Sequence, residues 1–388
     1  MTRHALRTQI REHVSELRKQ ARLQNQPKLV PLQLRNVVFT ELRKGYLNGE
    51  CVDRYVLFLR GTGCSWVTQT GGCTFCGFWD ATNFGEKISD EDTIAQVLNV
   101  INDEGSNFDR HPIICLYNDG SLLVQSEVGL DAVLYIFNLL SSRPHVKRIV
   151  IEAKIIDIAE EKIAKLMSVM NSKELEIAVG FESAEEIIRD LCINKNFSNR
   201  LFLSKVKILK DYGVSLVPLV MVKPPFLTES QAIEDVVKTL QYLEEFDLPR
   251  IDLELATVED HTLLYSLWKH GLYSTPWLWS VIEILRRRAA LKLKTPLFLS
   301  PPNYTATARD YTSNCPKCDG AIARAIEEYN RKFFDVSVFD SSDCDCKAEW
   351  IRELEREKPN GHLLGQIERV FGELLARENA LKGEEVLV

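Results

Sequence analysis

The chain of 388 residues carries a formal net charge of −7, with 45% hydrophobic and 27% charged residues. This composition is typical of a globular protein large enough to bury one extensive core, and the negative charge excludes an overall basic surface for nucleic acid. The sequence contains no run of eighteen apolar residues and no secretory signal, and its ten cysteines favour a reducing compartment. We therefore expect a cytoplasmic protein that crosses no membrane.

Residues 1–50 are predicted to form a helical extension followed by a loose connection. Apolar residues recur at helical spacing and give this helix one face that can pack: Leu6, Ile10, Val14 and Leu17. Up to Arg35, eight Lys or Arg stand against two Glu. This positive charge fits either a basic arm that contacts RNA phosphates or an ordinary solvated helix face, and the second interpretation is favoured.

Residues 51–300 alternate between strands and helices and are expected to form the main domain. Six apolar runs predict the strands: 55–59, 113–117, 148–152, 175–181, 214–222 and 251–255. Strand–helix repeats imply parallel strands joined by right-handed crossovers, and continuous apolar runs fit strands that are buried on both faces. The pattern is compatible with a doubly wound sheet and with an open barrel.

The loop after the first predicted strand contains Cys64, Cys73 and Cys76, with eight and then two residues between them. Three thiolates in one loop suit an iron–sulfur cluster, whereas a structural zinc site closes with four ligands. Three thiolates leave one iron of a [4Fe–4S] cluster open, and an open iron can bind a small molecule. The alternative is three buried free cysteines, for which a loop rich in Gly and Thr is a poor place.

Polar residues follow the other predicted strands at their carboxyl ends, where parallel sheets bind ligands. The second strand is followed by a run that either faces an ammonium group or simply makes a turn: Asn118, Asp119, Gly120 and Ser121. After the fourth strand, Glu182 and Ser183 are candidates for holding a cofactor, and Ser183 can also cap the next helix. Lys223, after the fifth strand, either meets a substrate anion or lies on the surface.

Residues 301–388 form a C-terminal segment that contains two further pairs of cysteines. Cys315 and Cys318 are separated by two residues, and Cys344 and Cys346 by one. Two chelating pairs are typical of a tetrahedral zinc site, and a second iron–sulfur cluster is the alternative. The neighbouring Lys and Asp residues are too polar for a core of unliganded cysteines. An amphipathic helix is expected to end the chain.

The cysteine loop resembles the cluster motif of the radical-SAM enzymes, in which the open iron chelates S-adenosylmethionine. Phe75 matches the aromatic residue that this family places beside the adenine. The long gap before Cys73 resembles the branch that includes the Elongator radical-SAM subunit and the archaeosine-forming radical-SAM enzymes (RaSEA). The run 223–229, the segment 276–280 and the C-terminal cysteines also resemble RaSEA. The resemblance implies an α/β fold built as an open (β/α)6 radical-SAM barrel.

The same resemblance assigns roles to residues at the strand ends. It implies that the segment 118–121 holds the methionyl amine of S-adenosylmethionine. Where relatives tend to show Glu-Ser-Arg-Pro after the third strand, this chain has Glu152, Ala153, Lys154 and Ile155. Glu152 thus stays a candidate substrate contact, as does Lys223. The absent Arg matters because Lys does not reproduce the forked donors of a guanidinium group.

The resemblance implies an enzyme that reductively cleaves S-adenosylmethionine and uses the 5′-deoxyadenosyl radical to abstract a hydrogen atom. Likeness to RaSEA implies tRNA modification, by C–N bond cleavage of a lysine adduct on a deazaguanine base. The alternatives are a radical enzyme acting on a small molecule and a non-enzymatic iron–sulfur and zinc protein. The expected partners are an electron donor of the ferredoxin or flavodoxin type, tRNA and a tRNA-binding synthase.

Overall fold

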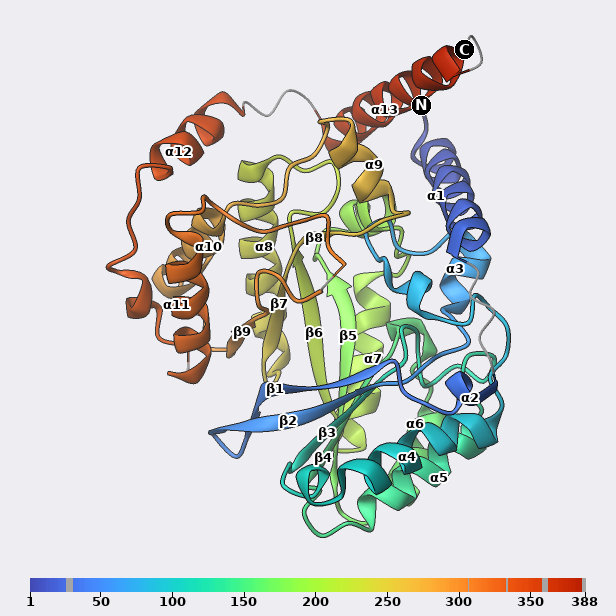
Figure 1. Ribbon diagram of the computed structural model, residues 1–388. Coiled ribbons are helices and arrows are strands. Elements are labelled where there is room, and N and C mark those ends of the chain that lie inside the picture. The colour runs from blue at the N-terminus through green and yellow to red at the C-terminus, as the bar shows by residue number, and fades with distance from the viewer. Residues whose placement is uncertain (26–30, 306, 333, 358–361, 386–388) are drawn as a thin grey trace.

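The computed structural model describes residues 1–25, 31–305, 307–332, 334–357 and 362–385. Figure 1 shows one large sheet with the strand order β1-β2-β3-β4-β5-β6-β7-β9. The strands are β1 (Phe39–Leu47), β2 (Glu50–Phe58), β3 (Ile113–Tyr117), β4 (Arg148–Glu152), β5 (Glu174–Glu182), β6 (Ser215–Val222), β7 (Ile251–Leu255) and β9 (Leu297–Leu299). The six predicted strands are present as β2 to β7.

The strand order decides between the two predicted architectures. Each strand from β2 to β7 pairs in parallel with the next one along the chain, and β9 continues the series beside β7. A doubly wound sheet requires this order to reverse at one point. Without a reversal, right-handed crossovers place successive helices on the same face, and the sheet curls into a barrel. The described residues pair β1 only with β2, so the predicted open barrel is confirmed.

The crossover helices pack against the outer face of this barrel (Figure 1). They are α4 (Asp90–Phe108), α5 (Leu130–Ser141), α6 (Glu160–Ser168), α7 (Asn199–Asp211), α8 (Glu229–Leu243) and α10 (Leu278–Ala290). The main core lies between strands and helices, where side chains such as Phe137, Ile151 and Val179 are fully buried. Further elements are α2 (Pro31–Leu34), α3 (Ser65–Thr70), β8 (Thr257–Val258), α9 (Leu263–Lys269), β10 (Asp310–Tyr311), α11 (Asp319–Arg331) and α12 (Lys347–Arg356).

The loose connection predicted before residue 50 is wrong in part, because strand β1 lies there. It pairs antiparallel with β2, from Phe39 opposite Phe58 to Leu47 opposite Glu50. The strand lacks an apolar run because its polar side chains, Glu41, Arg43 and Lys44, line the barrel cavity. The ring of Tyr46 lies 6.0 Å from that of Phe298 in β9, so side chains fill the gap between the first and last strands.

Helices from the two ends of the chain form a second core beside the barrel. In Figure 1, α1 (Arg3–Asn25) and α13 (Leu363–Glu385) meet at one corner of the molecule. The predicted apolar face of α1, with Leu6, Ile10 and Val14, is buried there together with Phe371 of α13. None of the helices in the described ranges is long and apolar enough to span a membrane.

Candidate functional site

A cavity of about 1080 Å³ opens inside the barrel at the carboxyl ends of the strands. Parallel barrels place their ligands at this end, because the loops that follow the strands converge there. Eight of the predicted site residues line the cavity: Cys64, Cys73, Phe75, Cys76, Asp119, Gly120, Glu152 and Glu182. Residues that are 118 positions apart in the sequence therefore meet at one site.

The other four predicted residues within the barrel are not among those that line the cavity. The Ser183 hydroxyl donates to Asp235 at 2.6 Å and accepts a hydrogen bond from the backbone N–H of Glu185 at 3.0 Å. The Lys223 ammonium group donates to Glu229 at 2.6 Å and to Ser274 at 3.1 Å. These two side chains stabilise the turns after β5 and β6, and Lys223 is not among the residues that line the cavity.

Asn118 and Ser121 support the loop that carries Asp119 and Gly120. Asn118 is buried, and its carbonyl oxygen lies 2.4 Å from the position that a Cβ atom would take at Gly61. The backbone N–H of Ser121 donates to the carboxylate of Glu127 at 2.6 Å. The run after β3 thus presents Asp119 and Gly120 to the cavity and uses its two outer residues for packing.

Two adjacent glycines return the cysteine loop to the cavity after the short helix α3. Cys64 precedes α3, and Gly71 and Gly72 follow it with φ values of 84° and 88°. A side chain disfavours this left-handed conformation, and a Cβ atom at Gly71 would lie 2.8 Å from the backbone nitrogen of Ser15 in α1. The turn lets Cys73 and Cys76 line the same cavity as Cys64.

The donor set in this loop fits a multi-iron cluster. Desolvation raises the pKa of Cys73 to about 11 and that of Cys76 to about 12, and the positive charge of Arg18 opposes both shifts. Bound iron would stabilise the thiolate forms. Within the described ranges, the one group of three or more potential ligands whose atoms lie within 4.8 Å of one another is at the C-terminus. At least two of the three loop sulfurs therefore lie more than 4.8 Å apart, and ligands of separate irons in one cluster are farther apart than ligands of a single ion.

The buried carboxylate of Glu127, which sequence analysis missed, joins three segments of the site. It accepts hydrogen bonds from the backbone N–H and the hydroxyl of Ser65 at 2.8 and 2.6 Å, from Ser121, and from the Lys154 ammonium group at 2.7 Å. A Cβ atom at Gly120 would lie 2.2 Å from this carboxylate, so only glycine fits there. Lys154 is therefore held by Glu127.

Three carboxyl groups in the cavity have raised pKa values. Desolvation and the charge of Glu152 raise the pKa of Asp119 to about 8. Desolvation and the charge of Asp252 raise that of Glu254 to about 7, and desolvation also raises that of Glu152. Sequence analysis did not predict Glu254, because this residue belongs to no motif. Its position near the end of β7 was the only signal that could have identified it as a site residue. A cationic group in the cavity would stabilise these carboxylates.

Glu182 differs from Asp119, Glu152 and Glu254 because it has a cation as its hydrogen-bonded partner. Its carboxylate accepts a hydrogen bond from Lys195 at 2.5 Å. At Gly180, a Cβ atom would lie 2.0 Å from the Lys195 nitrogen, so the absence of a side chain there lets the pair form. Desolvation opposes the protonated form of Lys195, but Glu182 and Cys73 raise its pKa overall.

Four arginines of α1 make contacts with the barrel, which neither interpretation of this helix predicted, whereas Lys19 and Arg22 stay exposed as a solvated face requires. Arg3 and Arg7 contact the carboxylate of Asp190 at 2.7 and 2.5 Å, and Arg11 donates to Asn194 at 2.8 Å. Arg18 is 4% exposed and bonds to the cysteine loop. These four residues dock the helix onto the site and are not a free arm or a solvated face. Residues 26–30 lie outside the described ranges.

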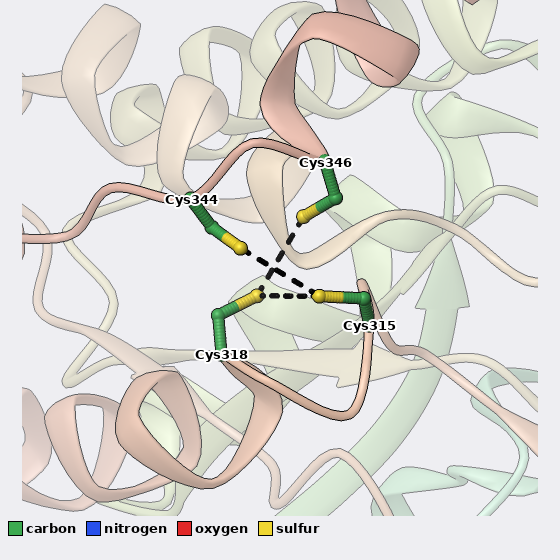
Figure 2. Close-up of side chains that lie close together, drawn as sticks. All are labelled: Cys315, Cys318, Cys344 and Cys346. Carbon is green, nitrogen blue, oxygen red and sulfur yellow. Dashed lines mark hydrogen bonds between the residues drawn. The ribbon is translucent and has the colours of Figure 1, made fainter.

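The C-terminal cysteines come together at the beginnings of α11 and α12, as Figure 2 shows. The Cys315 sulfur lies 3.7 Å from that of Cys318 and 3.6 Å from that of Cys344, and the sulfurs of Cys318 and Cys346 are 3.7 Å apart. A tetrahedral ion with metal–sulfur bonds of about 2.3 Å requires ligand separations of about 3.8 Å. The four thiols thus fit a single tetrahedral ion, while cysteines on separate irons of a cluster would be farther apart.

Comparison with known proteins identifies relatives that cover most of the chain. It is 31% identical over 314 residues to archaeosine synthase subunit beta of Methanosarcina acetivorans, a match that covers 80% of this chain and 88% of the relative. It is 26% identical to the protein of that name from Thermococcus kodakarensis, over 61% of this chain and 72% of the relative. An archaeal Elp3 structure from Methanocaldococcus infernus aligns with 16% identity and a TM-score of 0.43, covering 62% and 58% of the two chains. No family model matches.

Proposed function

The chain belongs to the archaeosine synthase subunit beta family, as its sequence predicts, and we propose that it is a radical-SAM enzyme that modifies a base in tRNA. The observation that carries this proposal is the placement of Cys64, Cys73 and Cys76 around one barrel cavity. These thiolates would hold a [4Fe–4S] cluster, which when bound supplies the electron that cleaves S-adenosylmethionine.

The residues around the cysteines would bind and orient S-adenosylmethionine. Phe75 offers an aromatic face for the adenine, and Asp119 offers a carboxylate for the methionyl ammonium group. Apolar side chains that also line the cavity, such as Phe58, Met221 and Phe298, would help to exclude water from the space beside the bound cofactor. A dry cavity protects a reactive radical from side reactions.

The finer proposal is that the substrate base carries a lysine adduct whose C–N bond is cleaved. Glu152 and Glu254 line the cavity at the ends of β4 and β7, and both have raised pKa values. An amino acid adduct brings an ammonium group, which these carboxylates would bind as ions. A neutral aromatic metabolite would leave the two carboxyl groups without a cation.

Binding of tRNA would require a partner subunit. The net charge of the chain is −7, and Arg3, Arg7, Arg11 and Arg18 make contacts within the protein. Few basic residues of α1 are then left for phosphates, so the chain alone should bind tRNA weakly. The relatives are named as a beta subunit, which supports a partner subunit, and we propose that this partner carries the tRNA.

The C-terminal cysteines would hold a structural zinc ion. The sulfur separations of 3.6 to 3.7 Å support one ion over a second cluster. The Trp279 indole N–H donates to the Cys346 sulfur at 3.3 Å, a bond that supports a thiolate ligand in its metal-bound form. The zinc would attach α11 and α12 to helix α10 of the barrel.

The test uses anaerobically reconstituted protein, S-adenosylmethionine, a chemical reductant that supplies the electron, and two substrates. One is tRNA that carries the lysine adduct, made with the partner synthase, and the other is the free adduct nucleoside. We expect mass spectrometry of digested tRNA to show loss of the adduct only when the enzyme and S-adenosylmethionine are both present. Turnover of the free nucleoside with no change in the tRNA would replace this proposal with a small-molecule reaction.

A further inference from the structure

Arg18 brings a buried positive charge from the N-terminal helix to the cysteine loop. Its Nε donates to the carbonyl oxygen of Gly71 at 3.3 Å, and its Nη2 donates to the carbonyl oxygens of Cys73, at 3.2 Å, and Cys76. The side chain is 4% exposed and lines the barrel cavity. One residue from outside the barrel thus holds the backbone of two of the three cysteines.

The charge of Arg18 is uncompensated in the described part of the chain. The two other cations near the cysteines each have a carboxylate partner, since Lys154 pairs with Glu127 at 2.7 Å and Lys195 pairs with Glu182 at 2.5 Å. Arg18 makes hydrogen bonds to carbonyl oxygens only, and its Nη1 is buried without a partner. A buried charge is costly unless an opposite charge compensates it.

We propose that Arg18 is the counter-charge of the cluster held by Cys64, Cys73 and Cys76, and that it raises the reduction potential of that cluster. The inference depends on the proposed cluster. Three thiolates make the cluster anionic, and one-electron reduction adds a further negative charge. A fixed cation in a low-dielectric site stabilises the reduced form more than the oxidised form. Arg18 is a positioning residue that prepares the site for electron uptake.

Other residues of α1 make docking contacts that do not involve Arg18, which makes the idea testable. Arg11 donates to Asn194 at 2.8 Å and its guanidinium lies 5.7 Å from the centre of the Trp66 ring. Asn194 in turn donates to the carbonyl oxygen of Gly72 at 2.7 Å. Arg11 does not line the cavity. Substitution of Arg11 therefore perturbs helix docking without removing a charge from the cluster wall.

The experiment compares the reduction potential of the full-length, anaerobically reconstituted protein with that of three variants by redox titration monitored by electron paramagnetic resonance. Arg18→Gln keeps an amide donor for the carbonyl oxygens and removes the charge. We expect this variant to bind the normal amount of iron. Its ratio of reduced to oxidised cluster at a fixed potential should be at least tenfold lower than in the wild type, which corresponds to a reduction potential about 59 mV lower for a one-electron couple. Arg18→Lys should shift the potential less in the same direction, and Arg11→Gln should leave it unchanged.

A wild-type potential in Arg18→Gln would overturn the inference, as would an equal shift in Arg11→Gln, because helix docking would then explain the effect. If Arg18→Gln retains no iron, Arg18→Lys decides, because Lys keeps the positive charge. A fall of about 59 mV or more in this variant would then overturn the inference, since the charge would not set the potential. Absence of any cluster in the wild-type protein would instead contradict the proposed function.

Discussion

Glu127 and Lys154 form an ion pair with 2.7 Å between the carboxylate oxygen and the ammonium nitrogen. Their side chains are 1% and 18% exposed, and the pair connects the residue after Cys64 with the end of β4. Breaking a buried pair leaves one charge without compensation. The pair is therefore expected to stabilise both the fold and the position of the cysteine loop.

Replacement of Glu127 by Gln should lower the free energy of unfolding of the cluster-free protein by about 3 kcal/mol. This value lies at the lower end of the range of about 3 to 5 kcal/mol for breaking a buried ion pair. The reason is that a carboxylate oxygen of Asp157 still lies 3.3 Å from the Lys154 ammonium nitrogen. Chemical denaturation measures the effect. The matched control is Glu161→Gln, which breaks an exposed pair with Lys165 of the same 2.7 Å length and should change stability little. If both substitutions lower the free energy of unfolding equally, burial does not make the Glu127–Lys154 pair more important for stability, and the prediction is wrong.

Replacement of Cys73 by Ala should abolish the cleavage of S-adenosylmethionine. The wild-type protein should bind about four irons at this site after anaerobic reconstitution, and the variant should lose the cluster. Iron analysis and chromatography of 5′-deoxyadenosine give the two readouts. Cys51→Ala is the control, because Cys51 lies in β2 and does not line the cavity, and it should retain both properties. Cleavage by Cys73→Ala at the wild-type rate would refute the assigned cluster site.

Replacement of Cys344 by Ser should release about one zinc ion per chain and loosen the C-terminal segment. This segment packs on the barrel through hydrogen bonds from Trp350 to Ser280 and from Trp277 to Glu353, both of 2.8 Å. Hydrogen exchange of α12 should therefore increase in the variant. A chain that lacks the three loop cysteines should still contain zinc and no iron. Iron and sulfide in that chain would instead indicate a second cluster.

The fold could be predicted from sequence wherever burial leaves a repeated pattern. The run Ile113–Tyr117 is buried, so its strand was recognisable, and the spacing of the cysteines marked both of their segments as candidate metal sites. Strand β1 was missed because its polar residues face a cavity inside the barrel. Lys223 stands at a strand end, but only the structure shows that Glu229 neutralises it. Arg18 and Glu127 act through contacts distant in sequence and have no local signal.

Asp119 should make the stability of the cluster-free protein depend on pH. Its pKa is raised to about 8 from an ordinary value of about 4, so the folded state favours the protonated form. Its contribution to stability is complete below about pH 4 and is lost as the pH rises toward 8. The free energy of unfolding should fall less between pH 5 and pH 8 in Asp119→Asn than in the wild type. Identical pH slopes in denaturation experiments would contradict the raised pKa.

The docked position of α1 changes what removal of the N-terminus should do. A chain without residues 1–25 lacks Arg18 and the apolar face of Leu6, Ile10 and Val14, which are fully buried. We expect this deletion to reduce iron retention and thermal stability, so any accompanying loss of tRNA binding would be indirect. Direct contact with tRNA must be tested on side chains that point to solvent.

Lys19 and Arg22 provide that test, because both are exposed and lie on the same helix. The double charge reversal Lys19→Glu and Arg22→Glu should leave the iron content unchanged. If a partner subunit supplies most phosphate contacts, the affinity of the complex for tRNA should also change little. A helix that contacts phosphates directly would instead lose about one unit of salt slope for each basic residue. Curves of tRNA binding at two salt concentrations, with and without the partner, separate the two outcomes. A large loss of affinity for tRNA at normal iron content would support the interpretation of this helix as a basic arm.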